Sequence, residues 1–321
     1  MALKAGVSTM TVSRALHDNG NVTEETKERV LAAVRELGYS RNENARSLRP
    51  GHSSNLIGVT VTDISNPYYG EFVIGVEEVL AQHGKRVILG NTSESQEREE
   101  QLLADFAGRQ VDGAIVVPAA GTEHTHLRSM ADRGMRVVLA SRSIDGLDVS
   151  SVVLADFQGA YDATVELIRS GHERIGFVGW AEGIYTAVKR YAGFAQAMSD
   201  HGIPVEERYV IDRVQGVEEV EKTIQGLFEQ PKSPTAFFSA NNRHHMGVFR
   251  AALQRRHELP DNFAMVSFDD FELSSLSPFP VIIVSHDPRE MGRTAAEMLL
   301  ESGREEQRVL PVHIRRSVRR V

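Results

Sequence analysis

The chain has 321 residues, with 36 Lys and Arg against 44 Asp and Glu, no Cys, and a formal net charge of −8. Its length suits two or three structural units. The absence of cysteine excludes a disulfide framework or a thiolate metal site and fits a reducing cytoplasm. No apolar run approaches the roughly 18 to 20 residues that span a bilayer, and residues 1–4 do not open a secretory signal. We therefore expect a cytoplasmic protein that does not enter the membrane.

The charge is unevenly distributed along the chain. Residues 1–51 hold eight Lys and Arg and six Asp and Glu, whereas the remainder holds 28 and 38. A basic segment favours the phosphates of nucleic acid, and an acidic body discourages non-specific contact with them. The contrast is modest, and it agrees with a DNA-binding segment at the N-terminal end.

Residues 5–16, which read AGVSTMTVSRAL, have the pattern of a helix-turn-helix. Gly6 suits the tight turn between two helices, and Ser8 is a favourable N-cap for the second helix. The apolar residues of this second helix recur at i, i+3 and i+4, and they are Val12, Ala15 and Leu16. Its outer side is left to Thr9, Met10, Ser13 and Arg14.

A third helix is expected between Thr23, its N-cap, and Gly38, which ends it. The apolar stripe of this helix consists of Val30, Val34 and Leu37. We predict that residues 1–41 form an all-α helix-turn-helix head that binds DNA. The alternative is a small three-helix unit with a structural role only.

The basic segment ARSLRPG joins this head to the rest of the chain. We expect a hinge over residues 42–53 and a body over residues 54–321.

The body alternates short apolar runs with amphipathic stretches. The expected strands are Leu56–Val61, Arg86–Leu89, Ala114–Val117, Val137–Ala140, Ile175–Val178, Ala236–Ser239, Met265–Phe268 and Val281–Val284. The amphipathic segments between them include Glu71–His83, Gln96–Arg109, Gln158–Ser170, Ala187–His201 and Arg243–His257. Such alternation predicts an α/β body with doubly wound parallel sheets. The pattern runs for about 230 residues, so we expect two similar lobes. Ligands of such sheets bind beyond the carboxyl ends of the strands.

The whole chain resembles the LacI/GalR family of bacterial repressors, to which the lactose, galactose and purine repressors belong. The resemblance is carried, in order, by AGVSTMTVSRAL, VTEETKERVLAAVRELGY, ARSLRPG, DISNPYYGEFVIGVE, VDGAIVVP, GHERIGFVG, KRYAGFAQAM, VSFDD and DPREMGRTAAEML. It implies a body like a periplasmic sugar-binding protein. We expect an N-lobe over residues 54–156 and 286–308 and a C-lobe over residues 157–285 and 309–321.

In the head, the resemblance implies which residues bind DNA. Thr9 and Met10 match positions that reach base edges, where their methyl groups suit thymine, and Arg14 can pair with guanine or phosphate. Leu48 matches a leucine that wedges between central base pairs from the minor groove; the alternative is an ordinary linker residue. The full predicted DNA-binding set is Ser8, Thr9, Met10, Thr11, Ser13, Arg14, His17, Asn42, Ala45, Leu48 and Arg49.

In the body, the resemblance implies an effector site. Arg190 and Asp269 match the family's most regular polar ligands, since an arginine opposite a carboxylate suits neighbouring hydroxyls. The alternative is an inter-lobe salt bridge without a ligand. The full predicted effector-binding set is Tyr68, Tyr69, Ser141, Thr186, Arg190, Arg213, Asn241, Asp269 and His286.

Several positions depart from the family pattern. Ser141 and Asn242 stand where the family often has aspartate, Arg213 where an aromatic is usual, and His286 where glutamine is common. Fewer acids and more basic groups favour a sugar phosphate or sugar acid over a neutral sugar as effector. The family's first helix begins about eight residues earlier, so we expect that the true start lies upstream of Met1.

Enzyme motifs are missing from the sequence: there is no GxxxxGK loop, no strand-linked GxGxxG and no GxSxG elbow. The histidine pairs 124/126 and 244/245 lack the spacing and the carboxylate partner of a helical metal site, so we expect them on the solvated surface and expect neither metal nor cofactor. An exported solute-binding protein or a sugar-modifying enzyme of similar fold is the alternative to a repressor.

No leucine heptads follow the body, and the segment after Ile314 suggests a final strand and a basic tail. We therefore expect a homodimer whose two heads bind a palindromic operator, controlled by a small sugar, sugar phosphate or sugar acid.

Overall fold

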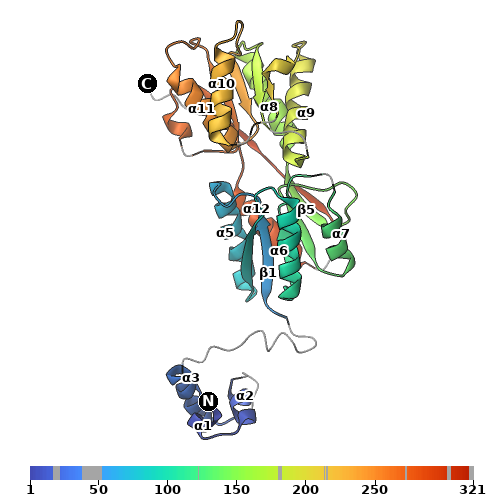
Figure 1. Cartoon of the computed structure of the whole chain (residues 1–321), viewed down its shortest axis with the longest axis vertical. Coiled ribbons are helices and arrows are strands. Elements are labelled where there is room, and N and C mark those ends of the chain that lie inside the picture. Colours follow the sequence, from blue (N-terminus) through green and yellow to red (C-terminus); the bar gives the residue numbers. More distant parts are fainter. Residues whose placement is uncertain are drawn as a thin grey trace. The chain divides into compact units, whose positions relative to one another are not determined.

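The computed structural model describes residues 1–16, 22–37, 53–121, 123–179, 183–212, 214, 216–271, 273–301 and 305–317. The chain divides into two compact units, Met1–Ser54 and Asn55–Val321 (Figure 1).

The first unit contains helices α1 (Ala2–Ala5), α2 (Thr9–Ala15) and α3 (Glu24–Glu36). Gly6 follows α1 with φ of 63°, in the left-handed region that glycine adopts without strain. Ser8 caps α2, because its side chain accepts a hydrogen bond of 3.0 Å from the Thr11 backbone nitrogen. The small core is formed by Ala5, Val12, Ala15, Val30 and Ala33. These helices agree with the predicted helix-turn-helix.

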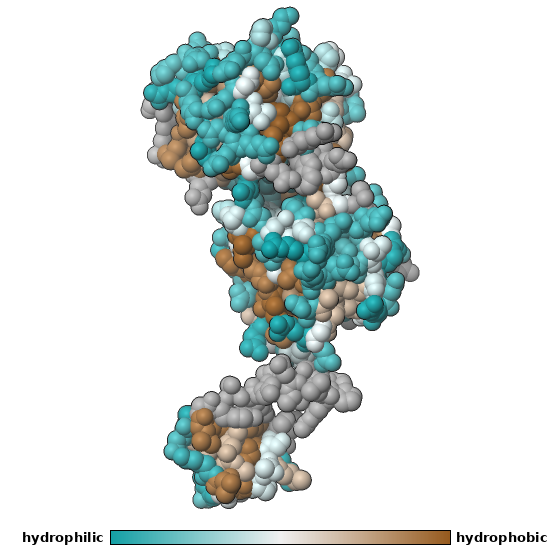
Figure 2. All heavy atoms as spheres, in the orientation of Figure 1, coloured by the Kyte–Doolittle hydropathy of each residue, from teal (hydrophilic) through white to brown (hydrophobic). Residues whose placement is uncertain are grey.

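The predicted cap of α3 is only partly correct. Thr23 occupies the N-cap position, but its side chain makes no capping hydrogen bond; its hydroxyl instead pairs with that of Thr26 at 2.9 Å. Apolar side chains also reach the surface of this unit (Figure 2), notably Leu3, which is 99% exposed, and Met10, which is 64% exposed.

The second unit contains two six-stranded sheets. In the first sheet the order is β11-β5-β4-β3-β1-β2, and every neighbouring pair is parallel. Its strands are β1 (Leu56–Val61), β2 (Arg86–Asn91), β3 (Gly113–Val116), β4 (Val137–Ala140), β5 (Ser150–Leu154) and β11 (Gln307–Leu310).

The second sheet has the order β12-β10-β9-β8-β6-β7, parallel except for the antiparallel edge pair β10–β12. Its strands are β6 (Ile175–Val178), β7 (Val210–Ile211), β8 (Ala236–Ser239), β9 (Ala264–Phe268), β10 (Val281–Ser285) and β12 (His313–Arg316). The last strand, β12, agrees with the final strand expected near Ile314; the tail beyond Ser317 lies outside the described residues.

Helices cover both faces of each sheet, as parallel sheets require. The first sheet packs against α5 (Pro67–Gln82) and α12 (Pro288–Leu300) on one face and against α6 (Gln96–Gly108) and α7 (Thr125–Asp132) on the other. The second packs against α8 (Asp156–Arg169) and α9 (Tyr185–Asp200), and against α10 (Val217–Phe228) and α11 (Asn242–Gln254).

The helices α5 and α12 approach each other at two glycines. A Cβ atom on Gly75 would lie 2.1 Å from the Arg289 carbonyl oxygen, and one on Gly292 would lie 2.1 Å from the Phe72 carbonyl oxygen. The absence of a side chain therefore allows these two backbones to touch.

The chain passes between the two lobes three times, after β5, after β10 and between β11 and β12. The lobe boundaries expected from the sequence, at residues 156/157, 285/286 and 308/309, lie near these three crossings. The exact domain limits remain predictions. Within the described residues, no helix has the length and apolar character that crossing a membrane requires.

Candidate functional site

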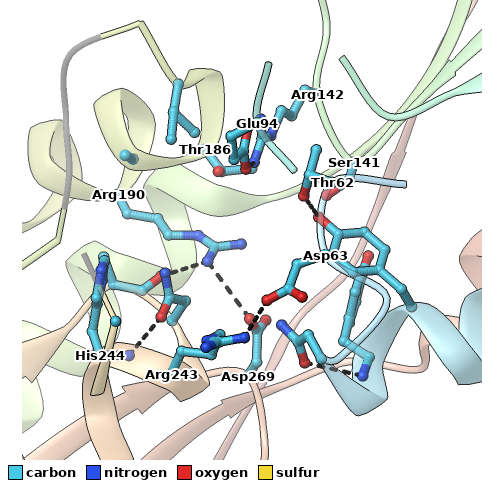
Figure 3. A pocket seen from close by; sticks show the side chains of 18 residues that line it. Thr62, Asp63, Glu94, Ser141, Arg142, Thr186, Arg190, Arg243, His244 and Asp269 are labelled. Atoms are coloured by element: carbon cyan, nitrogen blue, oxygen red, sulfur yellow. Dashed lines mark hydrogen bonds and ion pairs between the residues drawn. The ribbon is translucent and has the colours of Figure 1, made fainter. Parts of the chain in front are cut away.

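A cavity of about 280 Å³ lies between the two lobes, beyond the carboxyl ends of both parallel sheets (Figure 3). The first lobe contributes residues that follow β1, β2 and β4 and the start of α5, and the second lobe contributes α9 and residues that follow β8 and β9. This is where ligands of open α/β sheets bind.

Arg190 of α9 is the central cation of the cavity. Its Nε donates to Asp156 Oδ1 at 2.7 Å, and its Nη1 donates to the Ala240 carbonyl at 2.6 Å. Its guanidinium carbon lies 3.6 Å from the centre of the Phe268 ring. These three contacts fix the Arg190 side chain. Its Nη1 also lies 3.8 Å from Oδ2 of the Asp269 carboxylate.

Asp269 follows β9 with φ of 71°, a left-handed conformation that aspartate tolerates better than most residues. Its Oδ1 is buried without a hydrogen-bond partner. A buried carboxylate oxygen without a donor is costly. Oδ1 lies 3.7 Å from Nδ1 of the His286 imidazole, and the other oxygen, Oδ2, is the one that lies beside Arg190.

Asp156 lies behind Arg190 and is 2% exposed. Its desolvation raises the pKa to about 6, although the charge of Arg190 and the hydrogen bond from it act in the opposite direction.

The opposite wall contains a second buried ion pair. Arg142 donates to both carboxylate oxygens of Glu94, at 2.9 and 2.7 Å, and to the Pro118 carbonyl at 2.7 Å. Burial alone would lower the pKa of Arg142, but the bidentate contact with Glu94 outweighs it and raises the pKa. This wall is therefore rigid and nearly neutral.

Two tyrosines at the start of α5 complete the first-lobe side. Tyr69 accepts a 2.8 Å hydrogen bond from the Thr62 hydroxyl, and the Tyr68 hydroxyl lies 3.0 Å from the Met291 sulfur. Desolvation raises the pKa of both phenols. Both rings therefore stay neutral and offer apolar faces with hydroxyl groups.

Polar contacts hold the two lobes together beside the cavity. Asn66 and Asn242 exchange two amide hydrogen bonds, at 3.2 and 3.0 Å, and Arg243 pairs with Asp63. A backbone bond of 3.0 Å from the Gly121 nitrogen to the Gly183 carbonyl closes the other edge. The lobes are therefore closed on the cavity.

The structure brings most of the sequence-predicted effector residues together. The cavity is lined by Tyr68, Tyr69, Ser141, Thr186, Arg190, Asn241 and Asp269. His286 instead lines an adjoining cavity of about 470 Å³, together with Tyr68 and Asp269. Arg213 lies outside the described residues. The alternative of an inter-lobe salt bridge is wrong, because Arg190 and Asp269 both belong to the second lobe.

Sequence reasoning missed other polar side chains of the cavity. They are Thr62, Asp63, Asn66, Glu94, Arg142, Arg243 and His244. All of them come shortly after a strand or at the start of a helix, which is the signal that could have identified them. Among the described lining residues, three arginines pair with three carboxylates, so the cavity is close to neutral.

The four paired histidines are not on the solvated surface, which corrects the prediction. His244 and His245 are 8% and 0% exposed, and desolvation lowers the pKa of each to about 4. The side chains of His124 and His126 are also largely buried, and they do have a carboxylate partner, Glu99. Glu99 is distant in sequence, so local spacing could not reveal it.

In the first unit, α2 presents an exposed polar face. Thr9, Met10, Ser13 and Arg14 are exposed, whereas the Ser8 hydroxyl pairs with that of Thr11 at 2.8 Å. The other predicted DNA-binding residues lie outside the described residues: His17, Asn42, Ala45, Leu48 and Arg49.

Comparison with known proteins agrees with these features. A model of bacterial regulatory proteins of the lacI family matches residues 1–42, and a model of the periplasmic binding proteins and sugar binding domain of the LacI family matches residues 54–318. Catabolite control protein A of Priestia megaterium is 32% identical over 304 residues, which cover 93% of this chain and 90% of that protein.

Solved structures have the same fold. A LacI-family regulator from Silicibacter pomeroyi, 27% identical, superposes with a TM-score of 0.83, covering 98% of this chain and 96% of the other. The lac repressor dimer bound to operator and the anti-inducer ONPF, 23% identical, gives 0.82 with coverage of 98% and 96%.

A helix-turn-helix unit joined to a periplasmic-binding-protein-like body defines a DNA-binding transcriptional regulator. The chain belongs to the LacI family of bacterial regulatory proteins.

Proposed function

We propose that the protein is a cytoplasmic, homodimeric repressor of carbohydrate-metabolism genes, whose affinity for a palindromic operator is set by a small neutral sugar in the inter-lobe cavity. The similar lac repressor was solved as a dimer on its operator, and the similar catabolite control protein A bears a name that refers to catabolism. A dimer presents two heads to two half-sites.

The observation that carries the effector proposal is the pair of fixed groups at Arg190 and Asp269. The arginine is already held by Asp156, Ala240 and Phe268, and Asp269 lines the same cavity with Oδ2 3.8 Å from the arginine Nη1. A sugar hydroxyl can accept from such an arginine and donate to such a carboxylate.

The charge of the cavity favours a neutral sugar over a sugar phosphate or sugar acid. Glu94 neutralises Arg142, Asp63 neutralises Arg243, and Asp156 with Asp269 surrounds Arg190. A phosphate group would have to compete with carboxylates already bound to each arginine. We also propose that the protein binds its ligand without converting it chemically. The carboxylates of the cavity are engaged in ion pairs with arginines and are therefore not free to act as a general acid or base.

Asp269→Asn tests the effector site with little risk to folding, because asparagine also tolerates the left-handed conformation. Loss of the charged acceptor weakens a hydrogen bond worth about 1.5–3 kcal/mol, so we expect a roughly 10- to 150-fold weaker affinity for a neutral sugar identified by a thermal-shift screen. Isothermal titration calorimetry measures it.

Asp270→Asn is the matched control, because the adjacent Asp270 pairs with Arg315 and does not line this cavity. An equal affinity in Asp269→Asn and Asp270→Asn would show that the sugar binds elsewhere.

For DNA, we propose that the exposed face of α2 enters the major groove with Thr9, Met10, Ser13 and Arg14. Arg14→Ala should lower affinity for a selected operator by about 1–3 kcal/mol if Arg14 contacts a base, or lower affinity on all duplexes and reduce the salt slope by about 1 if it contacts phosphate. Arg35→Ala, at an exposed position on α3, serves as the control. Unchanged affinity for every duplex in Arg14→Ala would overturn this assignment.

A further inference from the structure

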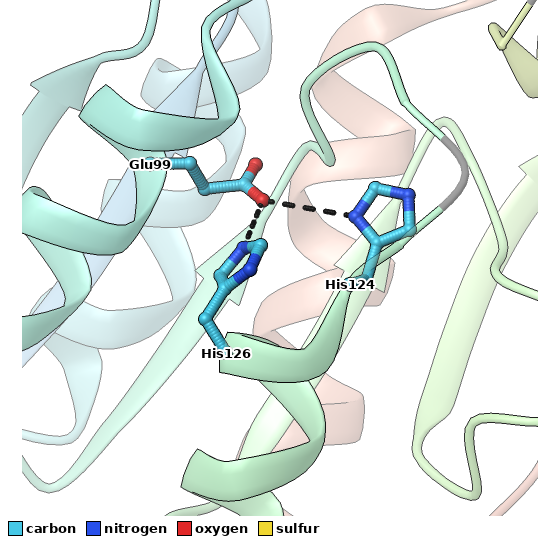
Figure 4. A group of neighbouring side chains, drawn as sticks. All are labelled: Glu99, His124 and His126. Atoms are coloured by element: carbon cyan, nitrogen blue, oxygen red, sulfur yellow. Dashed lines mark hydrogen bonds and ion pairs between the residues drawn. The ribbon is translucent and has the colours of Figure 1, made fainter.

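A second cluster of polar side chains lies in the first lobe, outside the polar groups that line the inter-lobe cavity. Glu99 projects from α6, His124 precedes α7, and His126 lies in the first turn of α7 (Figure 4). One ligand atom from each of the three residues lies within 4.8 Å of the others.

The cluster is buried, and its donor atoms converge. Glu99 is fully buried, and the side chains of His124 and His126 are 8% and 10% exposed. Glu99 Oε2 accepts a 2.6 Å hydrogen bond from the Ala119 nitrogen, which fixes the carboxylate. Glu99 Oε1 points at both imidazoles, 2.7 Å from His126 Nε2 and 4.0 Å from His124 Nδ1.

The distances from Glu99 Oε1 to the two imidazole nitrogens, 2.7 and 4.0 Å, can be compared with the distances between ligand atoms around a bound zinc ion. Tetrahedral zinc with bonds of about 2.0–2.1 Å has ligand atoms roughly 3.4 Å apart, and the two measured distances lie on either side of this value. Two histidines and one glutamate, with water in the fourth position, form a known zinc ligand set. The hydrogen bond from the Ala119 nitrogen holds one carboxylate oxygen of Glu99, as groups that hydrogen-bond to metal ligands do, and leaves the other oxygen to face the imidazoles.

We propose that Glu99, His124 and His126 bind one Zn²⁺ ion per chain. The competing explanation is that His126 and Glu99 form only a structural hydrogen bond, which the same geometry would satisfy. Imidazole nitrogen favours zinc strongly over magnesium, which prefers oxygen ligands in octahedral geometry. A metal site should therefore bind Zn²⁺ but not Mg²⁺, whereas a purely structural hydrogen bond should bind neither ion.

The metal would strengthen a segment that reaches both the inter-lobe cavity and the other lobe. The Ala119 nitrogen donates to Glu99, and the nitrogen of the next residue, Ala120, donates to Glu94 of the cavity at 3.0 Å. Gly121 donates across the lobe boundary to Gly183. Bound zinc would thus hold α6 and α7 together around the strand-end segment that takes part in lobe closure.

The test is calorimetric titration of the untagged, chelator-treated full chain with ZnCl₂ and, separately, MgCl₂. We expect one Zn²⁺ per chain and no heat of binding with Mg²⁺. Changes in outer partners of a metal typically lower affinity 10- to 100-fold, so losing a ligand in His126→Ala or Glu99→Gln should lower zinc affinity at least as much. His201→Ala, which removes an exposed histidine on the other lobe, should leave it unchanged.

Co²⁺ provides a readout that does not depend on heat. The wild type and His201→Ala should show the visible absorption of tetrahedral cobalt, and His126→Ala should not. Circular dichroism identifies any variant that fails to fold, and Glu99→Gln, which preserves size and an acceptor for Ala119, is the conservative variant. Zinc affinity that is equal in the wild type, His126→Ala and Glu99→Gln would overturn the proposal, as would the absence of zinc binding.

Discussion

Arg190 is held in place before any ligand is present. Asp156 and the Ala240 carbonyl accept its hydrogen bonds, and the Phe268 ring supports its plane. A side chain that is already ordered loses little entropy when a ligand binds. Arg142 is fixed in the same way by Glu94 and Pro118. The recognition groups on both walls are therefore pre-organised.

His245 gives a prediction on acid stability. It is fully buried beside the rings of Phe271 and Phe249, and desolvation lowers its pKa from 6.5 to about 4. The neutral imidazole is therefore favoured in the folded state, and its contribution is present above pH 6.5 and lost as the pH falls towards 4. The loss amounts to about 3 kcal/mol of unfolding free energy.

Replacing this histidine should remove that pH dependence. In His245→Leu, the free energy of unfolding should fall between pH 7 and pH 4 by about 3 kcal/mol less than in the wild type. Urea unfolding followed by circular dichroism measures both, with the exposed His201→Leu as control. Parallel pH profiles for wild type and His245→Leu would show that burial does not depress this pKa.

The rule that ligands bind beyond strand ends pointed to Tyr68 and Asn241 in the sequence, and the family resemblance pointed to Ser141 and Asp269; all four line the cavity. It did not single out Glu94 and Arg142, because their role depends on a pairing between residues 48 positions apart. The burial of His124 and His126 beside Glu99 depends on the fold in the same way.

At the scale of elements, the eight expected strands coincide with observed strands to within a few residues. The sequence reading missed β7, which has only two residues. It also missed β5, which opens with two serines, and β11, an edge strand with alternating exposure. Neither forms a continuous apolar run. It also missed α10, although Val220, Ile224 and Leu227 of α10 are spaced as a buried helix face.

The contact between α5 and α12 gives a prediction at this scale. Gly75→Ala would force a Cβ against the Arg289 backbone, and overpacking of this kind typically costs about 1–3 kcal/mol of stability. Gly70→Ala is the matched variant, because it lies on the same helix with open space around its Cβ. It should stabilise the protein by about 0.5–1 kcal/mol, since alanine is the better helix former.

Urea or thermal unfolding of the two variants beside the wild type measures this difference. Opposite signs are expected for Gly70→Ala and Gly75→Ala. A Gly75→Ala variant as stable as Gly70→Ala would mean that the helices do not approach as closely as the structure indicates.

At the scale of the whole molecule, the chain consists of two units with different surfaces and different expected ligands. The first unit is a small helical head whose α2 exposes Thr9, Met10, Ser13 and Arg14, and the second contains a nearly neutral cavity between two α/β lobes. A ligand can control DNA binding only if it favours one arrangement of the lobes over another. The contacts that join the lobes, from Asn66 to Asn242 and from Asp63 to Arg243, belong to the arrangement seen here.

The most direct test of this account is a fluorescence anisotropy titration of an operator selected from random duplexes, at one fixed salt concentration. It is carried out with and without a saturating neutral sugar that calorimetry has shown to bind the wild type. We predict that the sugar changes operator affinity at least about fivefold in the wild type, and that Asp269→Asn needs about 10- to 150-fold more sugar for half of the same change. Operator affinity in the wild type that does not respond to a sugar bound in the cavity would contradict the account.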